Sequence, residues 1–346
     1  MCGGVKLLAF SAFFIRPVRF GVSNHFPIRP HNSYRFSNYL ALDQMKYRIP
    51  PIGHSTGWIA GKISPQISVQ AEALRLAGDD AAELVPVSAE RIEALRTGSA
   101  LPAMRYLSFH LGDFREFNSW PASERLNFSN IILDAMLRYK VSGASVHPDL
   151  VTPEALAWLK NLEIPIAIEN MDRAKTYGKS VNEVISLCND FALPLVLDLQ
   201  HTYECALDNP RECRNLAEDF VRAAFNAHGI KHIHLSGEVL DSSGNQVQRH
   251  ASLLFASNRE AVMKSLFVVR ELCHGVLPPI ILEGDPIPHA PEVTGKLSSK
   301  AEQRLLEIAA QNMRAEREWL LNALQSNKPR VKSWLGTETT SSIFPS

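Results

Sequence analysis

Histidine and acidic residues recur at the ends of short apolar runs in this chain. The runs are MRYLSFH, SGASVH, IPIAIE, LPLVLD, IKHIH and LPPIILE. The residues that close or follow them are His110, His147, Glu169, Asp198, His201, His234, His250 and Glu283. Imidazole nitrogens and carboxylate oxygens bind ions such as zinc, iron and manganese. A catalytic zinc usually takes only three protein ligands, so this larger set predicts a site for two or three divalent metal ions (Zn, Fe or Mn).

Two of these acids stand out because of what precedes them. Glu169 follows IPIAI and Glu283 follows LPPIIL. An acidic group at the end of such a run must be paired, hydrated or bound to metal. We therefore expect both at the metal site, with Glu169 as the carboxylate that bridges two ions.

Three further residues are candidates for contact with the substrate. Arg249 offers a guanidinium that suits phosphate or carboxylate. His289 lies in the Pro-rich segment PIPHAPEV after the last run, and His54 in IGHSTGW either faces the site or lies in a loop. Glu238, after HLSG, is expected to accept a hydrogen bond from the imidazole of His234.

The apolar runs must be strands that bring these side chains together. From residue 46 to 325, runs of strand length alternate with amphipathic stretches, which predicts a single-domain (β/α)8 TIM barrel, an α/β fold. The carboxyl ends of barrel strands converge on one mouth, where such enzymes hold their chemistry. An open doubly wound sheet would carry a glycine-rich phosphate loop after its first strand, and the chain has no GxGxxG or GxxxxGK[ST] motif.

Several element boundaries can be predicted from the pattern. Thr152 and Pro153 are the expected N-cap and first residue of one helix, and residues 248–254 are expected to form a loop. Strands are expected within 49–58 and at 81–87, and helices at 66–77, 89–95, 122–139, 152–160 and 300–324.

Both ends of the chain differ from the barrel in composition. The first 42 residues contain no Asp or Glu but several Arg and Ser, which predicts an extension over 1–45 that is disordered or serves as a targeting segment. Residues 326–346 are expected to be a polar tail. We expect a cytoplasmic protein, with organelle targeting through the N-terminus as the alternative.

The overall composition bears on compartment and partner. The five cysteines form no CxxC pair and are expected to be free thiols of a reducing compartment. Lys plus Arg equals Asp plus Glu, 36 each, so net charge does not support a nucleic-acid partner, although a local basic groove is compatible with it. We expect a small-molecule or phosphoester substrate and no membrane partner, and the oligomeric state stays open.

The segments SFHLG, SVHP, IAIEN, VLDLQH, HIHLSGE…QRH and ILEGD resemble the xylose-isomerase-like superfamily of TIM barrels. This superfamily includes endonuclease IV, sugar isomerases and epimerases, and multinuclear-iron oxidases that act on peptides. The resemblance covers about residues 49–324. The similarity to endonuclease IV implies three ligand sets: His110, His147 and Glu169 for one ion, Glu169, Asp198, His234 and Glu283 for a second, and His201 with His250 for a third.

The resemblance departs at one ligand position. Endonuclease IV implies an Asp two residues before His250, where this chain has Gln248, so the third ion is expected to be weakly held or absent. The isomerases imply only the set with Glu169, Asp198, His234 and Glu283, and there the two Glu residues also transfer protons.

Three chemistries remain open from the sequence. Two or three ions would activate water against a phosphodiester, which uses every histidine of the set and is the interpretation we favour. A sugar or sugar-phosphate isomerase or epimerase leaves four histidines without a role. A multinuclear-iron oxidase that acts on a peptide or small molecule requires a redox metal, which the ligand types permit.

Overall fold

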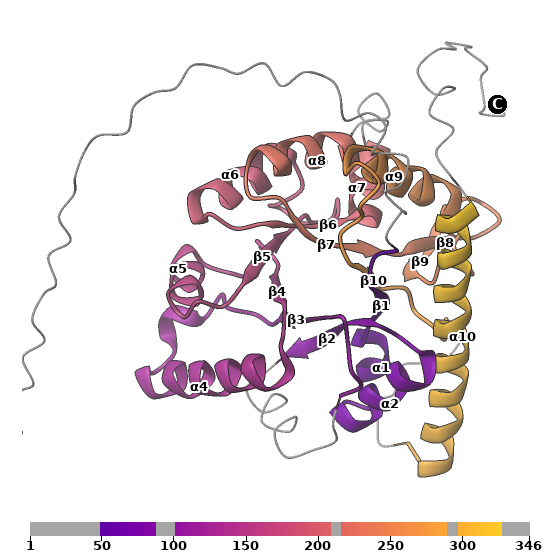
Figure 1. The fold of residues 1–346 in the computed structure, drawn as a ribbon, viewed down its shortest axis with the longest axis horizontal. Coiled ribbons are helices and arrows are strands. Elements are labelled where there is room, and N and C mark those ends of the chain that lie inside the picture. Colours follow the sequence, from indigo (N-terminus) through magenta and orange to yellow (C-terminus); the bar gives the residue numbers. More distant parts are fainter. Residues whose placement is uncertain (1–48, 88–100, 209–215, 289–296, 327–346) are drawn as a thin grey trace, which may run out of the picture. The chain divides into compact units, whose positions relative to one another are not determined.

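Eight parallel strands close into a barrel in the part of the chain that the computed structural model describes, residues 49–87, 101–208, 216–288 and 297–326. Their order around the barrel is β1-β10-β7-β6-β5-β4-β3-β2 (Figure 1). The strands are β1 (Ile52–Ser55), β2 (Ala81–Val87), β3 (Tyr106–Leu111), β4 (Gly143–Val146), β5 (Ile166–Glu169), β6 (Leu195–Asp198), β7 (Ile230–Leu235) and β10 (Ile280–Leu282). The predicted (β/α)8 fold is therefore confirmed.

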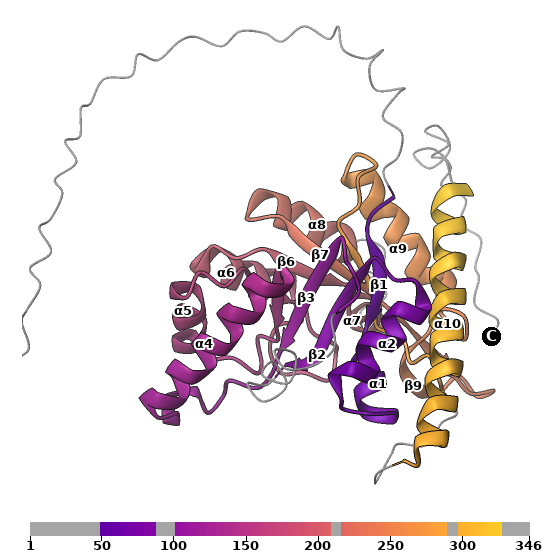
Figure 2. The same ribbon diagram turned by 60° about the horizontal axis from the view of Figure 1, so that its bottom comes forward.

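Helices alternate with the strands and cover the outside of the barrel. They are α1 (Gly57–Lys62), α2 (Ile67–Ala77), η2 (Phe117–Ser119), α4 (Ala122–Tyr139), α5 (Pro153–Asn161), α6 (Val181–Phe191), α7 (Leu199–Asp208), α8 (Leu216–Asn226), α9 (Arg259–Leu272) and α10 (Ser299–Ser326). The long helix α10 runs along the outside of the barrel beside α2 (Figures 1 and 2). None of the described helices is long and apolar enough to cross a membrane.

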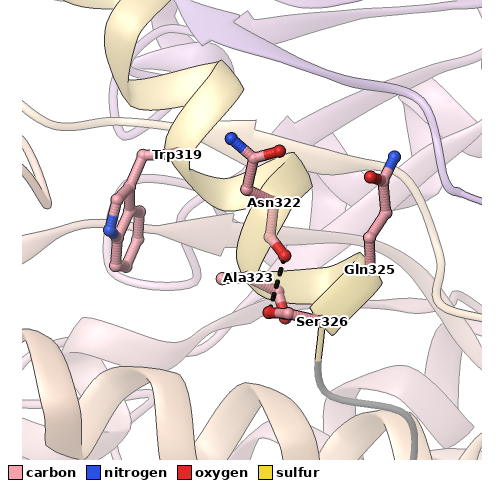
Figure 3. Close-up of a pocket in the computed structure, with 5 residues that line it drawn as sticks. All are labelled: Trp319, Asn322, Ala323, Gln325 and Ser326. Carbon is pink, nitrogen blue, oxygen red and sulfur yellow. Dashed lines mark hydrogen bonds between the residues drawn. The ribbon is translucent and has the colours of Figure 1, made fainter.

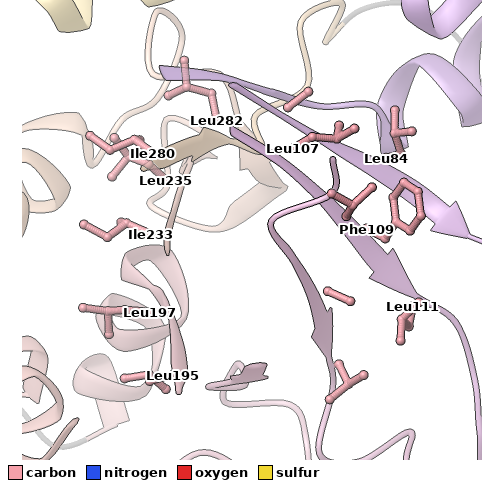
Figure 4. Packing of buried hydrophobic residues seen from close by; sticks show 14 of the residues in the cluster. Leu84, Leu107, Phe109, Leu111, Leu195, Leu197, Ile233, Leu235, Ile280 and Leu282 are labelled. Carbon is pink, nitrogen blue, oxygen red and sulfur yellow. The ribbon is translucent and has the colours of Figure 1, made fainter. Parts of the chain in front are cut away.

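Successive strand residues point alternately out of and into the barrel. The outward positions carry branched and aromatic side chains that pack beneath the helices (Figure 4), among them Leu84, Phe109, Leu197, Ile233 and Leu282. Inward positions near the amino ends form a small separate cluster of Ala81, Tyr106 and Ile281. The inward positions closer to the carboxyl ends are polar, and they position the site described below.

Most predicted elements are found near their expected bounds. Residues 81–87 and 122–139 match β2 and α4, and the last helix runs from 299 to 326. Thr152 is the N-cap of α5, and its hydroxyl accepts the Ala155 N–H at 3.2 Å. The predicted helix at 89–95, the extension 1–45 and the tail beyond 326 lie outside the described residues, as does His289.

One segment has a different structure from the prediction. The expected loop at 248–254 begins within a strand, β9 (Gln246–Ala251), which pairs antiparallel with β8 (Gly237–Leu240). The hairpin follows β7 directly, so it lies at the carboxyl end of the barrel, where a polar strand is half-exposed and lacks the apolar run of a core strand.

His54 lies on the outer face of the barrel, not at the mouth, so its assignment to substrate binding is wrong. It is buried on β1, and its Nδ1 lies 3.0 Å from Asp79 Oδ2, in the turn before β2. Its Nε2 lies 3.6 Å from Glu316 Oε2 on α10. Burial alone would lower the pKa of His54, but the two carboxylates outweigh it and raise the pKa to about 9. The charged imidazole of His54 thus connects α10 to β1 through its interaction with Glu316.

The ion pairs of His54 with Asp79 and Glu316 predict a loss of stability at alkaline pH. The pKa of His54 rises from 6.5 to about 9 on folding, so its contribution is complete below about pH 6.5 and disappears as pH rises through about 9. The shift corresponds to about 3 kcal/mol of unfolding free energy. Denaturant titrations between pH 6 and 10 should show this decrease in the wild type, and a His54→Ala variant should lack most of it. Parallel pH curves for the two proteins would rule out His54 as the source.

Candidate metal centre

The carboxyl ends of the barrel strands bring together all eight predicted ligands, in three groups. The first group contains His110 on β3, His147 after β4 and Glu169 at the end of β5. The two imidazoles approach with 2.9 Å between their Nε2 atoms. Glu169 Oε2 lies 3.5 Å from His110 Nε2 and 3.4 Å from His147 Nε2. Three donor atoms at such separations can surround one ion at ordinary metal–ligand bond lengths of about 2.0–2.2 Å.

A second group shares Glu169 with the first. It adds Asp198, His234 and Glu283, from the ends of β6, β7 and β10. His234 Nδ1 lies 3.3 Å from Glu169 Oε1 and 3.3 Å from Glu283 Oε1. The two oxygens of Glu169 therefore face different groups, Oε2 the first and Oε1 the second, which is the arrangement of a bridging carboxylate.

The third group contains Asp198, His201 and His250. His201 lies in the first turn of α7, where its backbone N–H donates to Asp198 Oδ1 at 2.7 Å. His250 lies on β9 with a φ of 47°, an uncommon conformation for a residue other than glycine. Such conformations cluster at functional sites, where the surrounding structure holds them.

The resemblance implied an acid at position 248 as a ligand of the third ion. Gln248 instead contacts a residue outside the third group. Its amide Nε2 donates to Asp285 Oδ2 at 3.0 Å, and Lys62 Nζ also donates to that oxygen, at 2.6 Å. Asp198 supplies the group with a carboxylate instead. The third group therefore contains a negatively charged candidate ligand despite the neutral Gln248. Whether an ion occupies this group stays a prediction.

Most of the ligand histidines have their second ring nitrogen placed against a hydrogen-bond partner. His110 Nδ1 lies 3.2 Å from the Leu111 carbonyl, and His201 Nδ1 lies 2.7 Å from the Asn170 carbonyl. His250 Nδ1 lies 3.2 Å from Ser236 Oγ. Partners of this kind fix the ring orientation and the tautomer, and they leave the other nitrogen for an ion.

The surroundings of Glu169 and Glu283, the two catalytic candidates, shift their pKa values in opposite directions. Burial would raise the pKa of Glu169, but His234, His147 and His110 outweigh it and hold the pKa well below its usual value. Burial and the negative charges of Glu169 and Asp198 raise the pKa of Glu283 well above the ordinary range, against the opposing effect of His234. Of the two, Glu169 is thus the carboxylate that stays ionised more readily, and Glu283 is the carboxyl that takes up a proton more readily.

Two inward residues of this region were missed from the sequence. Glu83 on β2 and His232 on β7 form a further group with His234. An acid inside the run AAELVPV and a histidine two residues before His234 were the available signals, because alternate strand residues share a face. Glu238, expected beside His234, instead accepts a hydrogen bond from Gln246 Nε2 at 2.5 Å.

Of the substrate-contact candidates, Arg249 lies next to the centre. It follows Gln248 on β9, its Nε donates to Gln246 Oε1 at 2.9 Å, and its Nη1 lies 3.6 Å from Asp172 Oδ1. Its side chain is 38% exposed, so the guanidinium keeps donors for an incoming anion.

The donor set fits divalent metal ions on its own chemistry. Glu169 Oε2, Asp198 Oδ2 and His234 Nδ1 are buried and have no hydrogen-bond partner of ordinary geometry. Leaving such groups unsatisfied costs about 1–3 kcal/mol each, so a ligand that satisfies them all at once is expected. The ligand types suit zinc, iron or manganese.

A hollow at the carboxyl end of α10 offers no comparable chemistry (Figure 3). It is lined by Trp319, Asn322, Ala323, Gln325 and Ser326, none of them a candidate ligand. The Ser326 hydroxyl is already bonded to the Asn322 carbonyl at 2.8 Å. The chemistry of the described residues therefore concentrates at the barrel mouth.

Comparison with known families gives one match, to the family described as UV-endonuclease UvdE, over residues 158–270. This segment is about a third of the chain, and it contains Glu169, Asp198, His201, His234 and His250. The match confirms the resemblance to xylose-isomerase-like TIM barrels. A search among curated proteins gave no match.

Solved structures show general similarity to the barrel. Endonuclease IV from Thermus thermophilus is 20% identical, with a TM-score of 0.48, and covers 79% of this chain and 100% of its own. A xylose isomerase-like TIM barrel protein from Mycobacterium smegmatis, in complex with magnesium, is 16% identical. Its TM-score is 0.47, with coverage of 81% of this chain and 98% of its own.

Proposed function

We propose that this chain is a metal-dependent endonuclease that cleaves a phosphodiester bond at damaged sites in DNA. The observation that carries the proposal is the bridged arrangement of three ligand groups around Glu169 and Asp198. The family match over residues 158–270, to UV endonucleases, supports DNA as the substrate.

DNA replaces the partner expected from composition. The prediction was a small-molecule or phosphoester substrate, with nucleic acid possible but unsupported by the net charge. Its preference for a small molecule over nucleic acid is wrong, because the family that the chain matches is described as a UV endonuclease. Net charge is summed over the whole chain, whereas a phosphodiester would contact only the barrel mouth. Net charge therefore did not indicate the partner. Two or three dications would outweigh the three carboxylates of the ligand groups there, Glu169, Asp198 and Glu283.

The three ligand groups support hydrolysis over isomerisation, one of the alternatives left open by the sequence. An isomerase uses only the group of Glu169, Asp198, His234 and Glu283, and it gives no role to the two neighbouring groups. The ions, when bound, would activate a water molecule and neutralise the charge of an in-line phosphodiester displacement.

The chain's own residues divide the remaining work. Glu169 stays ionised and holds the two neighbouring groups together. Glu283 would bind an ion as a carboxylate, and with its side chain 14% exposed it is the one of the three ligand carboxylates that the substrate can reach most easily. Arg249 would orient a phosphate through its planar fork of donors.

A nicking assay tests the proposal. Supercoiled plasmid is used untreated, UV-irradiated or partly depurinated, with protein loaded with zinc or manganese. We expect the damaged plasmids to become open circles much faster than the untreated plasmid, and a chelator to stop the reaction. Asp198→Asn, which removes a shared charge at constant volume, should slow nicking by about 100-fold or more.

Glu316→Gln is the matched control, since Glu316 is equally buried but pairs with His54 and the Leu253 N–H. Its nicking rate should stay near that of the wild type. Intact damaged plasmid after incubation with the metal-loaded wild type, or equal rates for all three plasmids, would refute the proposal.

A further inference from the structure

A buried carboxylate lies inside the barrel directly behind the metal centre. Glu83 is on β2 and is 0% exposed. Its Oε1 accepts hydrogen bonds from Ser145 Oγ at 2.7 Å and Ser108 Oγ at 3.0 Å. Its Oε2 lies 2.9 Å from His234 Nε2. Since β2 and β7 are not neighbours in the barrel, this contact crosses the barrel interior.

His234 thus connects two carboxylate environments through its two ring nitrogens. Its Nδ1 faces Glu169 and Glu283, and its Nε2 faces Glu83. A nitrogen that binds an ion must carry no proton, and a neutral imidazole keeps one proton on its other nitrogen. With Nδ1 as the ligand atom, the proton of His234 belongs on Nε2, which lies 2.9 Å from Glu83 Oε2 and 2.9 Å from His232 Nε2. Of these two neighbours the carboxylate carries the negative charge and attracts the proton more strongly.

We propose that Glu83 is a positioning residue for the metal centre, which fixes the tautomer and orientation of His234 and strengthens it as a ligand. This inference rests on the metal site of the proposed function, but not on its substrate. His110, His201 and His250 have uncharged partners, a carbonyl or a hydroxyl. Among these four described ligands, His234 alone has its second nitrogen on a carboxylate, which makes the ring more basic.

Neighbouring groups hold Glu83 in this role. A buried carboxylate is costly unless it is paired and hydrogen-bonded, and Glu83 has two serine hydroxyls and two imidazoles around it. The second imidazole, His232, lies with Nε2 3.5 Å from Glu83 Oε1 and with Nδ1 2.8 Å from the Tyr106 hydroxyl. A polar chain therefore runs from the metal centre to the amino end of the barrel.

The same three residues could instead hold an ion of their own. His232 Nε2 lies 2.9 Å from His234 Nε2, and both lie within 3.5 Å of a Glu83 oxygen. Such an ion would take the Nε2 position of His234, so the imidazole would have to lose both protons to serve two ions. The positioning role requires no such loss and is the one that we adopt.

The test compares Glu83→Ala and Glu83→Gln with wild type and Glu316→Gln, using cobalt(II) as the probe ion. Titration followed by the visible absorption of bound cobalt gives the affinity. Loss of a partner that orients a ligand typically weakens metal binding by about 10- to 100-fold, and we expect this for Glu83→Ala. Glu83→Gln keeps an acceptor oxygen without the charge, so its loss should be smaller. Glu316→Gln should bind as the wild type does.

A second readout reports on the imidazole itself. In the zinc-loaded, ¹⁵N-labelled wild type, His234 should show a proton on Nε2 and a metal-bound Nδ1. Glu83→Ala should lose the protected Nε2 proton, which a purely structural effect on folding would not cause in a protein that still binds zinc.

Three results would overturn the inference. They are an unchanged cobalt affinity in both Glu83 variants, an Nε2 of His234 without a proton in the wild type, and one ion fewer per chain in Glu83→Ala with unchanged affinity for the rest. If Glu83→Ala does not fold, Glu83→Gln decides, since it preserves the volume. None of these measurements involves DNA, so a failure of the nuclease proposal is seen separately.

Discussion

Glu169→Ala is expected to remove two of the three metal groups at once. Its Oε2 faces His110 and His147, while its Oε1 faces His234, so a single substitution takes a ligand from both neighbouring groups. Mass spectrometry of the metals in protein loaded with zinc and then desalted should show about two ions fewer than the wild type. Nicking of damaged plasmid should fall by about 100-fold or more, as when a main electrostatic contributor is lost.

His250→Ala provides the comparison for this effect. His250 belongs to the third group alone, so its variant should lose one ion at most and keep the pair that shares Glu169. Equal metal contents in the two variants would show that Glu169 does not bridge, whatever their activities.

The ligand set was accessible from the sequence because strand ends carry it. In IPIAIE and LPPIILE a long apolar run fixes the strand, and the acid that follows must lie where the strand leaves the core. The barrel rule then places all such ends at one mouth. No knowledge of side-chain contacts was needed to expect Glu169, Asp198, His234 and Glu283 at one mouth, whereas their assignment to a single ligand set came from the resemblance to known barrels.

The errors arose where a pattern does not specify which face a residue occupies. In IGHS neither alternation nor a long apolar run sets the inward positions, and His54 proved to point outward to Asp79 and Glu316. Glu83 was interpreted only as part of a strand, because the partners that make it informative, Ser145 and His234, are distant in sequence. The strand β9 was taken for a loop, since QVQRHA lacks an apolar face and depends on its pairing with β8.

Removal of the metal ions is expected to lower the thermal midpoint of unfolding strongly. The buried atoms Glu169 Oε2, Asp198 Oδ2 and His234 Nδ1 have no other partner of ordinary geometry among the described residues, so ions that bind only the folded chain stabilise it. An ion at about a thousand times its Kd contributes about 4 kcal/mol. For a domain of this size each kcal/mol corresponds to about 2–4 °C, so chelation should lower the midpoint by about 10 °C or more.

The same measurement on Glu169→Ala separates this effect from any general action of the chelator. The variant already lacks the ions that share Glu169, so its midpoint should begin lower and change by only a few degrees on chelation, whereas Glu316→Gln should show the full wild-type shift. Calorimetry with zinc and then with excess chelator gives both values for each protein. If the chelator lowers the midpoint of Glu169→Ala as much as that of the wild type, the stabilising ions are bound elsewhere than at Glu169. The cluster at the barrel mouth would then need another explanation for its buried, unpaired atoms.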